Sequence, residues 1–244
     1  MAKTVGRSDG SDDGALLALF RAIASRDDLE IARRLDSSLR LASRPIRIGA
    51  SRQDADTYFL AAIRHYVYGG DTALHIAAAA YQRELAESLV AKGADVRARN
   101  RRGAEPLHYA ADGSPDAEDW DPVAQRAVIA YLIAAGADPN ALDKSGVAPL
   151  HRAVRTRCSA AVSALIENSA DPRLMNKSGS TPLHLAVQNT GRSDSGSEAS
   201  KDEQGRVIAL LLRHGASPTD VDAKGKTVAA AASSDWIRHL LDTS

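Results

Sequence analysis

The chain has 244 residues, with 31 basic and 31 acidic side chains, so it carries no net charge that would draw it to nucleic acid or to an anionic membrane. Aromatic residues make up only 4%, and Cys158 is the single cysteine, which excludes an intrachain disulfide and fits a reducing compartment. No apolar run approaches the length that spans a membrane.

The N-terminal quarter is polar at first and then helical. Residues 1–14 are rich in glycine and aspartate, which predicts a disordered tail, and they do not resemble a signal peptide. Apolar residues at helical spacing predict two helices in 15–35. The segment 37–53 carries Arg40, Arg44, Arg47 and Arg52 with no acidic residue, and 54–68 is predicted to begin as a helix.

A four-residue motif ending in histidine then recurs along the chain. The interval between motif histidines is 33 residues, then 43 and then 33, so the middle interval is one period plus an insertion of ten. The copies are Thr72-Ala73-Leu74-His75, Glu105-Pro106-Leu107-His108, Ala148-Pro149-Leu150-His151 and Thr181-Pro182-Leu183-His184. A fixed period of this length predicts a tandem array whose units stack to bury their apolar faces.

A second motif follows each first one, in register. It reads Gly93-Ala94-Asp95, Gly136-Ala137-Asp138, Ser169-Ala170-Asp171 and Gly215-Ala216-Ser217. Proline in the first motif suits the first turn of a helix, and glycine in the second suits a left-handed helix end. Each unit is therefore predicted to hold two helices.

These paired motifs resemble ankyrin repeats. The resemblance implies an all-α ankyrin-repeat solenoid, in which helix pairs with hairpin fingers stack between a divergent N-terminal cap and a truncated C-terminal repeat. The expected divisions are a disordered tail 1–14, capping helices and connector 15–66, repeats 67–99, 100–142, 143–175 and 176–221, and a C-terminal capping repeat 222–244.

Two insertions interrupt the array between the helices of a unit. Residues 111–123 carry acidic side chains and Trp120 without a basic residue. Residues 189–205 are rich in serine, glycine and charge, which predicts a disordered loop. For Trp120 three interpretations stay open: it staples its own loop to the array, it anchors a partner, or its acidic loop folds over a basic groove and blocks it.

The motif histidines invite a metal or catalytic interpretation, but their recurrence at the repeat period favours a structural one. In the family this histidine bridges neighbouring repeats, which implies that role for His75, His108, His151 and His184. No motif for metal binding, phosphate binding or nucleophilic catalysis is present, so we expect neither an enzyme nor a cofactor. Cys158 is expected to be a packing residue and not a reactive thiol.

Binding in this family uses the fingertips and the inner face of the first helices. The resemblance therefore implies a non-catalytic protein–protein interaction module, expected to be monomeric, cytoplasmic and, from its alanine and arginine content, bacterial. Basic residues recur at the fingertips, where they are often merely solvated but, aligned in a row, would favour a partner with an acidic surface. The candidate partner-binding residues are Tyr68, Asp71, Arg99, Arg101, Arg102, Trp120, Lys144, Arg155, Lys177, Gln188, Lys224 and Lys226.

Two other functions remain open. The basic row, together with 40–52, would also suit a polyanion such as nucleic acid, although aromatic residues that stack on bases are missing from the fingers. The aromatic-rich segment 54–81 would suit a small-molecule site if Tyr58, Tyr66, Tyr68 and Asp71 converged on a closed pocket.

Overall fold

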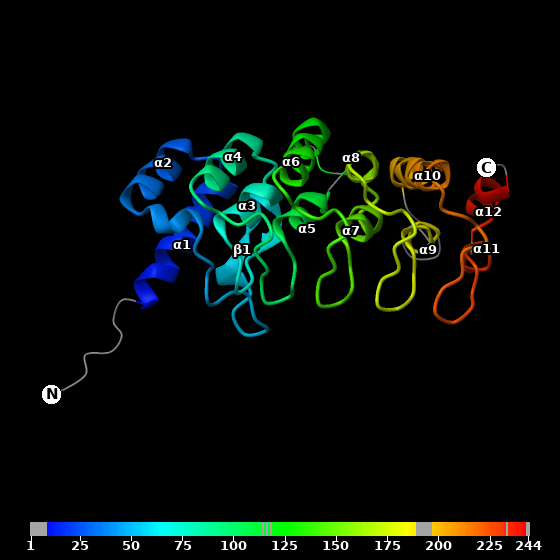
Figure 1. Ribbon diagram of the computed structural model, residues 1–244, viewed down its shortest axis with the longest axis horizontal. Helices are drawn as coiled ribbons and strands as arrows, with labels where there is room; N and C mark the ends of the chain where they lie inside the picture. The colour runs from blue at the N-terminus through cyan, green and yellow to red at the C-terminus, as the bar shows by residue number, and fades with distance from the viewer. Residues whose placement is uncertain are drawn as a thin grey trace.

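The fold is a stack of helix pairs with loops projecting from one edge (Figure 1). The computed structural model describes residues 9–113, 115, 117, 119–188, 197–232 and 234–242. Within these residues strand is confined to one short hairpin, so the all-α solenoid expected from the sequence is confirmed.

The first helices of successive units pack side by side and form an inner layer. These helices are α1 (Asp9–Ala24), α3 (Ala73–Ala79), α5 (Pro106–Ala111), α7 (Pro149–Arg155), α9 (Pro182–Ala186) and α11 (Val228–Ala231). Pro106, Pro149 and Pro182 occupy the first helical turn, where a missing N–H costs no intrahelical hydrogen bond. Small, fully buried alanines such as Ala77 and Ala110 let the inner helices approach closely.

The second helices form an outer layer. They are α2 (Asp28–Ser37), α4 (Arg83–Ala91), α6 (Pro122–Ala134), α8 (Ser159–Glu167), α10 (Glu198–Arg213) and α12 (Asp235–Asp242). Each of α4, α6, α8 and α10 buries a leucine in the core, namely Leu89, Leu132, Leu165 and Leu211. Behind three of these helices a glycine with positive φ reverses the chain, and in the fourth case Ser169 adopts this conformation with φ +71°.

The connector after α2 departs from a simple finger. Its residues from Ile46 hydrogen-bond to the start of the next unit, with Ile46 N donating to Asp71 O at 2.8 Å and Ala50 N donating to Val67 O at 2.7 Å. Between these two paired stretches lie the 3-10 turns η2 (Asp56–Tyr58) and η3 (Ala61–Ile63) and an antiparallel hairpin of β1 (Phe59–Leu60) and β2 (His65–Tyr66). A further 3-10 turn, η1 (Leu39–Ala42), follows α2.

The prediction that 54–68 begins as a helix is therefore wrong beyond the three residues of η2. Phe59 and Tyr66 face each other across the hairpin with ring centroids 4.8 Å apart, and Arg64 turns the chain in the left-handed region with φ +50°. Cross-strand aromatic contact and the reversal at Arg64 favour extended backbone here.

Helices begin inside both segments that were predicted to be disordered. Helix α1 begins at Asp9, inside 1–14, and the arginine-rich connector holds the next two aspartates. Arg44 Nη1 lies 2.6 Å from Asp12 Oδ2, and Arg47 N donates to Asp13 Oδ1 at 3.3 Å. Helix α10 begins at Glu198, inside 189–205, and the buried Gln204 donates to Ala186 O at 2.7 Å. The rest of both predictions, over 1–8 and 189–196, lies outside the described residues.

Candidate functional site

The fingers share one internal hydrogen-bond pattern. An Asn or Asp opens each finger, and its side-chain oxygen accepts two backbone N–H groups further along the turn. Asn100 accepts from Arg102 and Ala104 at 2.9 and 3.1 Å, and Asp143 accepts from Ser145 and Val147 at 2.8 and 3.0 Å. Asn176 and Asp222 repeat the arrangement. These turns fix each fingertip without requiring a partner.

Adjacent fingers are also tied to each other by their backbones. Arg101 N donates to Gly69 O at 2.7 Å, and Lys144 N donates to Arg102 O at 2.9 Å. Gly103 has φ +77°, and a Cβ at this position would lie 2.8 Å from Lys144 N. Glycine is required there because both the backbone conformation and the closeness of the next finger exclude a side chain.

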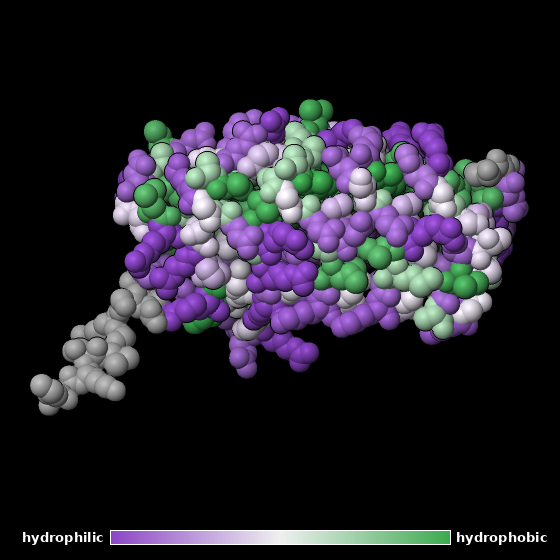
Figure 2. All heavy atoms as spheres, viewed as in Figure 1, coloured by the Kyte–Doolittle hydropathy of each residue, from purple (hydrophilic) through white to green (hydrophobic). Residues whose placement is uncertain are grey.

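The fingertip cations form one exposed row. We define the finger row as Arg101, Arg102, Lys144, Lys177, Lys224 and Lys226, all of which are exposed. Within the described parts of the chain, none of them has a carboxylate within ion-pair distance. Hydrophilic side chains dominate the lower edge beneath α3 to α7, where the fingers project (Figure 2). The array thus presents several unneutralised positive charges along one edge.

The first two members of the row are held by an aromatic ring. The guanidinium carbons of Arg101 and Arg102 lie 5.4 and 4.8 Å from the ring centroid of the half-buried Tyr68. Cations stack on such rings because the ring face carries negative potential. Lys177 is held differently, by donating its ammonium to Lys144 O at 2.5 Å.

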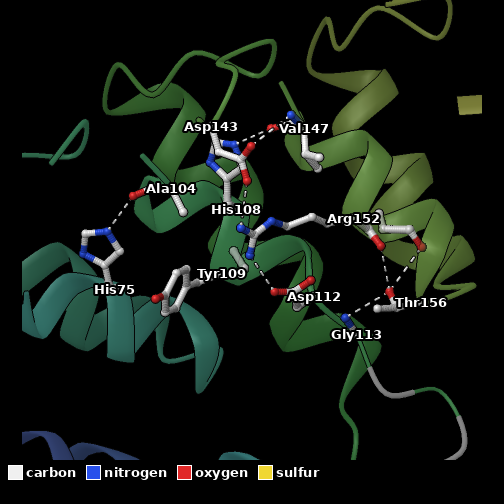
Figure 3. Close-up of polar contacts among 12 residues, drawn as sticks. His75, Ala104, His108, Tyr109, Asp112, Gly113, Asp143, Val147, Arg152 and Thr156 are labelled. Atoms are coloured by element: carbon white, nitrogen blue, oxygen red, sulfur yellow. Dashed lines mark hydrogen bonds and ion pairs between the residues drawn. The ribbon is translucent and has the colours of Figure 1, made fainter. Parts of the chain in front are cut away.

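Arg152 on α7 occupies the middle of the inner face. It donates to Asp112 Oδ2 at 3.0 Å and to Asp143 Oδ2 at 3.3 Å, so it joins the end of α5 to the next finger (Figure 3). Burial opposes the charge of Arg152, but the two carboxylates outweigh burial and raise the pKa of its guanidinium. Burial likewise opposes the charge of Asp143, while backbone N–H groups and Arg152 lower the pKa of its carboxyl.

Asp71 lies fully buried just before α3 and is bonded to Asn100, which opens the next finger. Its carboxylate accepts from Tyr68 N at 2.6 Å, Asn100 Nδ2 at 2.8 Å and the Tyr109 hydroxyl at 2.8 and 2.9 Å. Burial, followed by the Asp71 charge, raises the pKa of Tyr109 well above its ordinary value. The prediction that Asp71 contacts a partner is therefore wrong, because its oxygens are occupied and inaccessible.

Sequence reasoning missed Tyr109, Arg152 and Asp112. The only signal was that Tyr109 and Arg152 follow a motif histidine, at a position where other repeats carry Ile76 and Leu185. A polar side chain at a position that is apolar in sister repeats marks a local specialisation of the array.

The inner face holds a pocket of about 230 Å³. We call it the finger pocket, since two fingers, those opened by Asn100 and Asp143, line it together with helices α5 and α7 and the connector with its β1–β2 hairpin. Its described lining is Arg64, His65, Tyr66, Tyr68, Asn100, Arg102, Ala104, Tyr109, Asp112, Asp143, Ser145, Val147, Arg152 and Arg155.

The four residues expected to form a small-molecule site do not converge. Tyr66 and Tyr68 line the finger pocket, Tyr58 does not, and Asp71 is buried behind it. Of the predicted partner-binding residues, the finger pocket instead brings together Tyr68, Arg102 and Arg155.

The motif histidines lie along the stack, one to a repeat. In each, Nδ1 accepts the backbone N–H of the residue before the helix, at 3.1 Å in His108 and 3.2 Å in His75. Because Nδ1 is the acceptor, Nε2 carries the proton and donates to the next repeat. His75 donates to Ala104 O at 3.2 Å and His108 to Val147 O at 3.0 Å (Figure 3). His184 donates to Lys226 O at 3.1 Å.

His151 makes the same Nδ1 hydrogen bond as the other motif histidines but not the same Nε2 hydrogen bond to the next repeat. Its Nδ1 accepts from Ala148 N at 3.2 Å, whereas its buried Nε2 has no well-aligned partner among the described residues. Burial lowers the pKa of His75 and His151, and it lowers the pKa of His108 to about 4. Across the described ranges, no three histidine, cysteine or acidic side chains are grouped so as to hold a metal ion.

Trp120 is half-buried and is hydrogen-bonded to α6, the helix that follows it. Its Nε1 donates to Gln125 Oε1 at 2.8 Å, and Gln125 in turn donates to Ala110 O at 2.9 Å. The neighbouring Asp119 pairs with Arg64 of the hairpin at 3.0 Å. The acidic insertion therefore touches the connector hairpin, and Trp120 packs against the array.

The remaining predicted residues lie apart from one another. Arg99 is exposed and pairs with the buried carboxylate of Glu105 at 3.0 Å. Gln188 is exposed at the end of α9, and its carbonyl accepts from Gln204 at 2.7 Å. Cys158 is a buried thiol 3.1 Å from Gln125 Oε1, and burial raises its pKa to about 11.

Comparison with known proteins places the repeats along most of the chain. The family described as "Ankyrin repeats (3 copies)" matches residues 19–118 and 123–196, and the family described as "Ankyrin repeat" matches residues 178–225. No curated protein matches the sequence. Within the described residues, none of the helices is long and apolar enough to cross a membrane.

Proposed function

The chain belongs to the ankyrin-repeat family, and from this premise we propose that it captures a protein partner with an acidic surface along its finger row and inner face. Ankyrin repeats generally mediate protein–protein interaction, and proteins built from them are typically non-catalytic. We further propose that the four motif histidines are structural, that the protein acts as a monomer in the cytoplasm, and that no cofactor takes part.

The single observation that carries this proposal is the unneutralised finger row. Some exposed arginines elsewhere on the surface form ion pairs, as Arg126 does with Glu167 at 2.8 Å and Arg83 with Glu87 at 2.8 Å, whereas the isolated Arg97 and Arg213 form none with a described residue. The finger row lacks such partners in the described structure, although the whole chain has equal numbers of acidic and basic residues. Cations aligned on a rigid edge attract an oppositely charged surface and speed its approach.

Affinity capture from a nuclease-treated lysate of the native host tests the proposal. The bait is the full chain, compared with Lys144→Glu/Lys177→Glu and with a control that reverses two exposed outer charges, Lys92→Glu/Arg213→Glu. We expect a protein that the wild type and the control retain and the finger-row variant loses. Equal capture by all three baits contradicts the proposal.

The same experiment separates the polyanion alternative. A polyanion complex would disappear after nuclease treatment and would weaken by orders of magnitude between about 50 and 200 mM salt. Recovery of nucleic acid before treatment, and of no protein after it, would favour that alternative.

A further inference from the structure

The finger pocket contains more positive than negative charge. Four of its described lining residues are arginines and two are aspartates. Arg152 forms ion pairs with Asp112 and Asp143, at 3.0 and 3.3 Å, and Arg64 forms one with Asp119, at 3.0 Å. Arg102 and Arg155 remain, and in the described chain neither is paired with a carboxylate. The pocket therefore has two guanidinium groups without a counter-charge.

These two arginines come from different elements, and both line the pocket. Arg102 is on a fingertip and is stacked on Tyr68 at 4.8 Å, which restricts its side chain. Arg155 ends α7 on the inner face. Restricting a side chain before binding lowers the entropy that is lost when a ligand binds.

The hairpin and α7 supply further polar atoms to the pocket, from His65 and Arg152. The His65 ring contacts the Tyr109 ring at a tilt, with centroids 4.3 Å apart, and its Nε2 has no hydrogen-bond partner among the described residues. Arg152 Nε is unpartnered in the same way. Buried polar atoms without partners are uncommon in folded proteins, and both of these belong to residues that line the finger pocket.

We infer that the finger pocket receives the carboxylate of one glutamate or aspartate side chain of the partner, between Arg102 and Arg155. This inference rests on the proposed function, because the carboxylate is presented by the bound protein. Guanidinium groups match the planar, two-oxygen geometry of a carboxylate and form short, charge-assisted hydrogen bonds with it.

The chemistry of the walls favours a carboxylate over a phosphate group. Asp112 and Asp143 line the same pocket and would repel an ion of charge near −2 more strongly than a monoanion. Its volume of about 230 Å³ is below the range of pockets that hold drug-sized ligands, roughly 300–1,000 Å³, which suits a single side chain.

A titration of the full chain with small probes tests the inference without the natural partner. The probes are N-acetyl-glutamate methylamide, the uncharged N-acetyl-glutamine methylamide and inorganic phosphate, followed through the backbone and arginine Nε–H resonances. We expect saturable shifts centred on Tyr68, Arg102 and Arg155, with a Kd on the order of 1 mM for the glutamate probe. The glutamine probe should bind at least about tenfold more weakly because it carries no charge.

Variants localise the response. Arg155→Gln should weaken glutamate binding about tenfold, Arg155→Lys should weaken it less, and the outer-helix control Arg213→Gln should bind like wild type. Thermal unfolding of each variant verifies that the fold is retained. Glutamate shifts that persist in Arg155→Gln, equal binding of both amino-acid probes, or tighter binding of phosphate at the same residues would each overturn the inference.

The outcome is distinguishable from failure of the proposed function. If no probe binds while affinity capture still depends on Lys144 and Lys177, the pocket is not an anchor and the finger row remains the binding surface. If the probe binds as expected while the lysate yields no partner that depends on the finger row, the proposed function fails and the carboxylate site stands.

Discussion

The Tyr109 hydroxyl donates to both oxygens of the buried Asp71 carboxylate, at 2.8 and 2.9 Å, and thereby links α5 to the residue that precedes the N-cap of α3 in the preceding repeat. Two more groups donate to this carboxylate, namely Tyr68 N at 2.6 Å and Asn100 Nδ2 at 2.8 Å. A fully buried carboxylate depends on such donors because it has lost its hydration.

We predict that Tyr109→Phe lowers the free energy of unfolding by about 1–3 kcal/mol, since it leaves Asp71 short of a donor. Denaturant unfolding measures the change. The control is Tyr131→Phe, which removes a hydroxyl without a hydrogen bond among the described residues and should cost less than about 0.5 kcal/mol. Equal effects of the two substitutions would show that the Asp71 contact contributes nothing.

Arg152 should matter more than a surface arginine in an ion pair of similar length. Arg152→Ala leaves Asp112 and the mostly buried Asp143 without their cation, and we expect a loss on the order of 3 kcal/mol. Arg126→Ala breaks the exposed pair with Glu167 and should cost at most about 1 kcal/mol. Chemical denaturation of both variants compares them, and a loss for Arg152→Ala no greater than that of Arg126→Ala would contradict the prediction.

Stability should decline when the pH falls from about 7 towards 4. Burial holds the pKa of His108 at about 4, below the ordinary histidine value near 6.5, so in this window the unfolded chain binds protons that the folded chain does not. Folding is then favoured at high pH, and the advantage is lost as the pH drops through the window. His75 and His151 act in the same direction.

The test is His108→Gln, followed by denaturant unfolding at several pH values and constant ionic strength. Its unfolding free energy should vary less steeply than that of the wild type, by about 1.4 kcal/mol per pH unit at most. A slope identical to that of the wild type between pH 4 and 6.5 would mean that His108 takes up its proton equally in both states.

Cys158 should resist thiol reagents in the folded protein. Its side chain is fully buried and its pKa is raised to about 11, so both access and thiolate content are low. Labelling by a chromogenic disulfide should be slow in buffer and complete within the mixing time in denaturant. Rapid labelling of the folded chain would indicate that the joint between α7 and α8 opens readily.

Reversing charge on the finger row should slow association with the captured partner. For Lys144→Glu/Lys177→Glu we expect a lower on-rate at about 50 mM salt and a smaller difference from wild type at about 500 mM, because salt screens the attraction. Surface plasmon resonance provides both rates, and Lys92→Glu/Arg213→Glu is the matched control. An on-rate unchanged at low salt would show that the finger row does not steer the partner.

The repeat architecture was determined by the sequence alone. Its signals are local: a proline or threonine that starts a helix, a glycine that ends one, and a histidine three residues into the inner helix that accepts a backbone N–H from its own turn. Such contacts span a few residues and recur at a fixed period, so they can be read directly from the order of the amino acids.

Only part of the proposed binding surface could be predicted from the sequence. The exposed finger row follows from the position of each cation in its repeat. The finger pocket does not, because the pairs that build it, Tyr109 with Asp71 and Arg152 with Asp112, are 38 and 40 residues apart and meet only when neighbouring repeats stack. The hairpin of β1 and β2, in a segment that the sequence predicted only to begin as a helix, forms one side of the pocket for the same reason: packing against Tyr109 outweighs the local preference of a short segment.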